Sequence, residues 1–215
     1  MEAVKVVSVI EKRSYKKDDV RHFDIVLGYD VGRFGSPKSV IAVVGKLKGS
    51  EDEKLYFIDY RIVSKKGMDW QIGWVKDLVK RFNAGKIVVD ATGLGSTVYD
   101  VLKERLGEEA EVIGFGFSRR KERFELYDNL KYLIEEGRLL LLDDVRLREN
   151  FNAFRVKYRS DGTRNIEKRR DIESDILDVL ALAVYGLDVG NIKYYVADFM
   201  NLDAYFNIMG SGMLW

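Results

Sequence analysis

The sequence contains no cysteine, a single histidine and a single proline among its 215 residues. Without cysteine, the chain can form neither a disulfide nor a thiolate metal site. With His22 as its one imidazole, it cannot build a histidine-based zinc site, and a serine–histidine–aspartate triad is disfavoured. Any metal must therefore be held by oxygen ligands, which favours Mg²⁺, Mn²⁺ or Ca²⁺.

The sequence also lacks the long apolar segments of membrane and secreted proteins. No run approaches the ~18 apolar residues of a membrane helix, and the charges at Glu2 and Lys5 are unlike a signal peptide. Hydrophobic residues make up 47% of the chain and charged residues 33%, with 36 basic against 35 acidic side chains. This composition is typical of one globular domain, and the net charge of +1 indicates no particular partner.

The apolar pattern predicts three strands first and then alternating helices and strands. The first predicted helix rests on a four-residue spacing of large apolar side chains: Trp70, Trp74, Leu78 and Phe82. The expected strands are 23–30, 40–47, 55–63, 86–90, 112–117 and 139–142, and the expected helices are 69–83, 96–106, 124–136, 146–151 and 174–187.

This order of elements predicts an α/β fold. Three antiparallel strands followed by β-α-β units give a mixed sheet, antiparallel and then parallel, with helices on both faces. That is the order of the ribonuclease H-like fold, here with a basic β-hairpin inserted over 153–169. We expect the domain to span 23–190, preceded by an N-terminal arm or linker at 1–22 and followed by an aromatic tail at 191–215.

Acidic residues stand where apolar runs end. Asp30 and Asp90 each follow a buried strand, and Asp178 lies within an apolar helix, three residues after Asp175. A buried carboxylate costs several kcal/mol unless it is paired, hydrogen-bonded or bound to a cation. Asp30 and Asp90 could simply open turns, and Asp175 could cap its helix. Capping explains Asp178 poorly, so the four acids together predict an anionic site for a hard divalent cation.

Basic side chains are concentrated in and around the hairpin. Their alternation suits contact with phosphate backbones, which positions a duplex without reading its sequence. The alternative is a solvated edge strand on which lysine and arginine prevent aggregation. Near the turn after Asp30, Lys38 and Ser39 could also reach phosphates. The candidate nucleic-acid contacts are Lys38, Arg119, Arg120, Lys121, Arg155, Lys157, Arg159, Arg164, Lys168 and Arg169.

Five short segments carry a family resemblance when they are taken in order. They are Gly28-Tyr29-Asp30-Val31-Gly32, Ile87-Val88-Val89-Asp90-Ala91-Thr92-Gly93-Leu94-Gly95, Gly114-Phe115-Gly116-Phe117-Ser118 with Lys121, Ile134-Glu135-Glu136-Gly137-Arg138-Leu139, and Asp175-Ile176-Leu177-Asp178-Val179-Leu180-Ala181-Leu182-Ala183. Their order resembles the C-terminal nuclease domain of the large terminase subunit of tailed viruses, of the ribonuclease H-like superfamily. The resemblance runs from about 23 to about 187, and the last segment is its most specific part.

The resemblance implies a metal-dependent endonuclease that cuts double-stranded DNA with little sequence specificity during viral genome packaging. Asp30, Asp90 and Asp178 would hold two Mg²⁺ or Mn²⁺ ions, with Asp175 as an auxiliary ligand. The implied partners are the viral portal and the small terminase subunit, and the implied compartment is the host cytoplasm. The ATPase domain of the family has no counterpart here, because no G-x-x-x-x-G-K-[ST] motif occurs. We therefore expect an excised domain or a stand-alone relative.

Two alternative functions use the same residues. A Holliday-junction resolvase, or another ribonuclease H-like nuclease, shares the acidic set, and resolvases act as dimers on branched DNA. A non-catalytic DNA-binding or docking module would use the basic surface and the aromatic tail without cutting. Cleavage of linear, supercoiled and four-way DNA distinguishes these functions from packaging-type cleavage.

Overall fold

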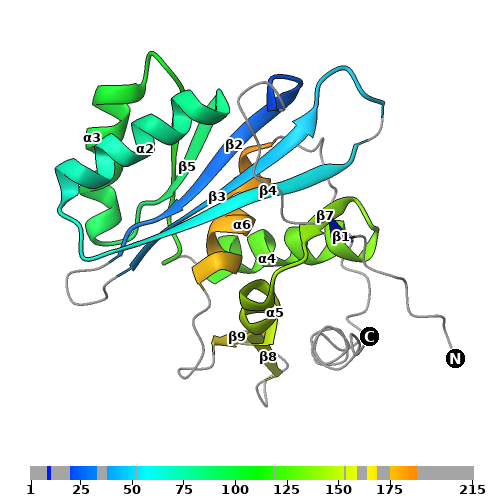
Figure 1. Ribbon diagram of the computed structural model, residues 1–215. Helices are drawn as coiled ribbons and strands as arrows, with labels where there is room; N and C mark the ends of the chain where they lie inside the picture. Colours follow the sequence, from blue (N-terminus) through cyan, green and yellow to red (C-terminus); the bar gives the residue numbers. More distant parts are fainter. Residues whose placement is uncertain are drawn as a thin grey trace, which may run out of the picture.

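The computed structural model describes residues 9–10, 20–32, 38–51, 53–118, 120–152, 154–158, 164–168 and 175–187. Within these ranges a seven-stranded sheet has the order β1-β7-β4-β3-β2-β5-β6, and β8 and β9 form a separate hairpin (Figure 1). The strands are β1 (Val9–Ile10), β2 (Phe23–Asp30), β3 (Lys38–Leu47), β4 (Leu55–Ser64), β5 (Lys86–Asp90), β6 (Glu111–Phe115), β7 (Leu139–Leu142), β8 (Phe154–Tyr158) and β9 (Arg164–Lys168).

The pairing of these strands confirms the predicted mixed sheet. β2, β3 and β4 pair antiparallel in sequence order, while β5 is parallel to β2, β6 to β5 and β7 to β4. The two residues of β1 pair parallel with β7, which places part of the predicted N-terminal arm at the sheet edge. The aromatic tail at 191–215 lies outside the described residues.

Helices cover both faces of the sheet (Figure 1). α2 (Met68–Phe82) and α3 (Leu94–Leu106) pack on one face, in a core that includes Tyr29 and Leu102. α4 (Arg120–Glu135), α5 (Val145–Asn152) and α6 (Asp175–Gly186) pack on the other, in a core that includes Phe57 and Leu180. Among the described helices, none has both the length and the apolar character needed to cross a membrane.

Helix α2 forms where the sequence predicts it, and its buried face includes Leu78 and Phe82 of the predicted spacing but not Trp70. Its buried side chains are Ile72, Val75, Leu78, Val79 and Phe82. Trp70 is instead 46% exposed and stacks on Trp74, with ring centroids 6.0 Å apart. A strict four-residue spacing drifts around a helix of 3.6 residues per turn, so Trp70 and Phe82 end on different sides.

Candidate metal centre

Two carboxylates end neighbouring parallel strands. Asp30 is the last residue of β2 and Asp90 the last of β5. Parallel strands end at the same edge of a sheet, so both acids lie at one edge. Gly28 and Val88 face α6. Because side chains alternate along a strand, Asp30 and Asp90, two residues further on, point to that same face.

Helix α6 brings two more acids to this edge. It runs antiparallel to β2, with Val179 against Gly28 and Gly186 against Val26. This direction places the first turn of α6 at the end of β2. Asp175 and Asp178 lie in that turn, three residues apart and therefore on one side of the helix.

The first turn of α6 is held by a buried asparagine from α5. The backbone N–H of Ile176 donates to Oδ1 of Asn150 over 3.0 Å, and Asn150 Nδ2 donates to the carbonyl of Arg146 over 2.9 Å. These bonds satisfy one of the unpaired N–H groups at the helix start and fix the position of Asp175. No pattern in the sequence points to Asn150, because its partner lies 26 residues away.

Asp30, Asp175 and Asp178 form what we call the acid cluster. One carboxylate oxygen of each lies within 4.8 Å of the others, and Asp178 is only 6% exposed. Two unit charges at this separation repel by about 3 kcal/mol at an effective dielectric constant of ~20. A divalent cation replaces that repulsion by attraction, and carboxylate oxygens are the ligands that Mg²⁺, Mn²⁺ and Ca²⁺ prefer. The residues present therefore fit a hard divalent cation.

Asp90 ends the neighbouring strand but is not a member of the acid cluster. Its Oδ1 accepts a hydrogen bond of 2.9 Å from the N–H of Thr92, and Oγ1 of Thr92 accepts one of 3.0 Å from the N–H of Phe117. A Cβ at Gly95 would lie 1.8 Å from the carbonyl oxygen of Asp90, so α3 begins in direct backbone contact with this turn. The carboxylate is thus held in place by its own turn at the acidic edge.

Tyr127 of α4 contacts the acid cluster from the side. Its hydroxyl donates a hydrogen bond to Oδ1 of Asp178. The guanidinium of Arg123 lies over the tyrosine ring, 5.8 Å from its centroid. Burial first, and the charge of Asp178 second, raise the pKa of Tyr127 well above its ordinary value, so the hydroxyl keeps its proton and remains a donor. Sequence reasoning missed Tyr127, since 51 residues separate it from its partner.

A second hydrogen-bond network lies beneath the acidic edge on the α2 side. The hydroxyls of Tyr29 and Ser39 donate to Oε1 of Gln71 over 2.6 and 2.5 Å, and Ser39 Oγ accepts from the N–H of Gly32 over 3.0 Å. The expectation that Ser39 reaches phosphates is therefore wrong: it is 3% exposed, and its hydroxyl is engaged inside the protein. The network instead fixes the backbone immediately after Asp30.

The predicted basic residues occupy several elements. Lys38 begins β3 at the acidic edge, and the exposed Lys121 pairs with Glu125 over 3.8 Å in the first turn of α4. The predicted hairpin is present as β8 and β9, with Arg155 opposite Glu167. Arg120 lies in α4, Arg155 and Lys157 in β8, and Arg164 and Lys168 in β9, whereas Arg119, Arg159 and Arg169 lie outside the described residues.

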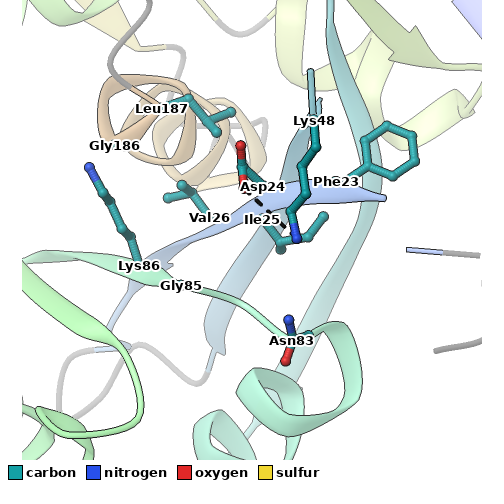
Figure 2. Close-up of a pocket in the computed structure, with 10 residues that line it drawn as sticks. All are labelled: Phe23, Asp24, Ile25, Val26, Lys48, Asn83, Gly85, Lys86, Gly186 and Leu187. Carbon is teal, nitrogen blue, oxygen red and sulfur yellow. Dashed lines mark ion pairs between the residues drawn. The ribbon is translucent and has the colours of Figure 1, made fainter. Parts of the chain in front are cut away.

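The pocket drawn in Figure 2 is separate from the acid cluster. It is lined by the start of β2, by the turn after α2 and by the end of α6, and Lys48 there pairs with Asp24 over 4.0 Å. Asp24 and Asp30 stand near opposite ends of β2, about 20 Å apart at ~3.4 Å per residue. The opening therefore belongs to the far end of the sheet.

The sheet order, the two helical layers and the acidic edge together define a ribonuclease H-like domain. Comparison with curated proteins gives no significant match. The chain belongs to the terminase ribonuclease H-like domain family, whose model matches residues 27–185. This confirms the family predicted from the motifs, and membership supports a nuclease role in DNA packaging.

Solved structures of large terminase nucleases share the fold. The nuclease of thermophilic phage G20c, with bound magnesium, aligns with a TM-score of 0.66 and 17% identity over 83% of this chain and 92% of that chain. The nuclease domain of Thermus phage P74-26 gives 0.64 and 18% over 86% and 92%. The nuclease domain of bacteriophage SPP1, with bound manganese, gives 0.55 and 15% over 85% and 97%. These similarities confirm the predicted fold class.

Proposed function

We propose that this domain is a metal-dependent endonuclease that cuts double-stranded DNA with little sequence specificity during viral genome packaging. The observation that carries the proposal is the acid cluster of Asp30, Asp175 and Asp178, placed at the sheet edge where the strand of Asp90 also ends. Two strand ends and one helix start supply hard oxygen ligands from rigid elements. Catalytic metal sites need ligands held in this way.

The proposed ligands are Asp30, Asp90 and Asp178, with Asp175 as an auxiliary ligand, for two Mg²⁺ or Mn²⁺ ions. When bound, such ions activate a water molecule and stabilise the charge on the leaving oxygen of a phosphodiester. Bound magnesium in the G20c nuclease and bound manganese in the SPP1 domain support this choice of metals.

Other side chains of the domain would position the acids and contact the DNA. Asp30 and Asp90 stand on hydrogen-bonded strands and cannot move apart without breaking the sheet, whereas Asp178 is placed by the packing of α6. We propose that Lys38, Lys121 and the β8–β9 hairpin contact DNA phosphates, which orients the backbone over the acids without selecting a sequence. The proposed setting is the host cytoplasm, with the viral portal, the small terminase subunit and an ATPase domain as partners.

The test is a plasmid-nicking assay in Mn²⁺ on wild type and on Asp30→Ala, Asp90→Ala and Asp178→Ala. We expect the wild type to nick and linearise the plasmid and each variant to lose this activity. Asp24→Ala is the matched control, because Asp24 lies on the same strand as Asp30 but at the opposite end. It should cut like the wild type.

The substrate distinguishes packaging-type cleavage from the alternatives. Linear and supercoiled duplexes should be cut at scattered positions, and a four-way junction should be cut no faster than its arms. Preferred, symmetric cleavage at the junction would support a resolvase instead. Absence of cleavage in the wild type, or equal cleavage by all three aspartate variants, would support a non-catalytic DNA-binding module.

A further inference from the structure

Tyr127 connects α4 to the acid cluster. The hydroxyl of Tyr127 donates to Oδ1 of Asp178, the most buried carboxylate of the cluster. A carboxylate on a helix can rotate about its terminal torsion, which is broad and roughly two-fold. A hydrogen bond to one named oxygen removes that freedom and sets the plane of the group.

The position of Tyr127 is itself determined by its neighbours. Its ring contacts that of Phe117, with centroids 6.3 Å apart, and Arg123 lies over it at 5.8 Å. The N–H of Phe117 donates to Thr92, whose own N–H donates to Asp90. A continuous set of contacts therefore runs from the turn of Asp90 through Phe117 and Tyr127 to Asp178.

This arrangement has the form that metal sites use to orient their ligands. Ligating carboxylates in such sites are commonly hydrogen-bonded by residues that do not touch the metal, and loss of one such partner costs about 10–100-fold in metal affinity or activity. The hydroxyl also places the positive end of its O–H dipole beside three mutually repelling carboxylates. Tyr127 can therefore stabilise the cluster and hold it in a fixed geometry.

We propose that Tyr127 is a positioning residue of the metal centre: its hydroxyl fixes the orientation of the Asp178 carboxylate, so that cation affinity depends on a residue of α4 that does not contact the cation. The inference rests on the proposed function, because it takes Asp178 to be a metal ligand. It concerns the affinity for the cation and not the substrate.

The test compares Tyr127→Phe with a control that loses the same chemical group elsewhere. Tyr60→Phe serves, because the Tyr60 hydroxyl donates to Oδ1 of Asp144 over 2.8 Å, outside the acid cluster. Plasmid cleavage is measured across a range of MnCl₂ concentrations. Tyr127→Phe should raise the half-maximal concentration by about 10–100-fold, and cleavage should recover at saturating Mn²⁺. Tyr60→Phe should leave the metal dependence unchanged.

Calorimetric titration of the same proteins with MnCl₂ alone separates this inference from the proposed function. A wild type that binds Mn²⁺ but cuts nothing, with weaker binding in Tyr127→Phe, would keep the inference and overturn the nuclease. Equal Mn²⁺ dependence and equal binding in Tyr127→Phe and wild type would overturn the inference alone. Thermal unfolding in EDTA serves as the folding check. If Tyr127→Phe unfolds, the titration is repeated on Phe117→Leu, which keeps the hydroxyl but removes the ring contact that places Tyr127. Weaker Mn²⁺ binding in this variant would support the inference, and unchanged binding would overturn it.

Discussion

Replacement of Gly28 by alanine should move Asp175 and Asp178, which lie on α6, away from Asp30, which lies on β2. Gly28 lies two residues before Asp30 on β2, directly under α6. A methyl group there would lie 1.9 Å from the carbonyl oxygen of Val179 and 2.7 Å from the backbone nitrogen of Ala183. Both are backbone atoms of a buried helix, so no side-chain rotation can relieve the clash.

The size of the effect follows from these distances. Non-bonded heavy atoms settle near 3.5 Å, so α6 must retreat from β2 by about 1.5 Å to admit the methyl group. Overpacking a well-filled core costs about 1–3 kcal/mol, and the rigid partner here favours the upper end. The same retreat moves Asp175 and Asp178 away from Asp30. Displacement of catalytic groups by about 1 Å can cost about 100-fold in rate.

Urea unfolding and plasmid cleavage measure the two effects. Gly73→Ala is the matched control, because Gly73 lies in α2 and a Cβ built there meets no described atom within 4 Å beyond its chain neighbours and the backbone of its own helix. It should stabilise the protein by about 0.5–1 kcal/mol through helix propensity and leave cleavage unchanged. If Gly28→Ala lost less than about 1 kcal/mol and cut like the wild type, direct packing of α6 on β2 would not be what assembles the acids.

Three further predictions concern other contacts of the acidic edge and core. Ser39→Ala removes the acceptor of the Gly32 N–H, so it should lower the free energy of unfolding in urea by about 1–2 kcal/mol and reduce plasmid cleavage. Unchanged cleavage would show that the Ser39–Gln71 network does not support the acid cluster. Asp175→Asn removes one repelling charge, so it should raise the melting temperature in EDTA and reduce the gain on adding MnCl₂, whereas an equal gain would exclude Asp175 from the metal site. Burial raises the pKa of Tyr60 above its ordinary value; a raised folded-state pKa gives stability that is present below about pH 10 and lost above it. Between about pH 10 and 12, the free energy of unfolding in urea should therefore fall less for Tyr60→Phe than for the wild type. An equal fall would show that the pKa of Tyr60 is not raised by folding.

The fold could be predicted because its signals are local. Each strand and helix is marked by the period of its own apolar residues, and β2 to β4 follow one another with turns short enough to require antiparallel pairing. The differences are small and have local causes. The helix expected from 96 begins at Leu94, because Gly93, at φ 62°, turns the chain and Gly95 allows backbone contact with Asp90. A side chain at either position would be strained or would clash.

The partners of the acids could not be predicted because they have no local signal. Tyr127 and Asn150 each occupy an ordinary position in an amphipathic helix, and only the packing of α4 and α5 against α6 shows what they contact. Gln71 likewise lies 42 residues from Tyr29 and 32 from Ser39. Sequence patterns identify charged groups at the ends of elements, whereas the groups that hold them are identified by tertiary contacts.

The contacts of α6 indicate that the packing of this helix is enough to bring Asp175 and Asp178 to Asp30. Of the 12 residues of this helix, all but Asp175 and Tyr185 are buried. Large apolar side chains contribute about 1.5–3 kcal/mol each on burial, so the six of α6 together contribute about 9–18 kcal/mol, against about 3 kcal/mol of repulsion for each of the three carboxylate pairs in the acid cluster. These six are Ile176, Leu177, Val179, Leu180, Leu182 and Val184. Under the proposed function, a cation would therefore enter a site whose carboxylates are already held by the fold. Its binding energy would then add to the stability of the protein instead of being used to order the chain.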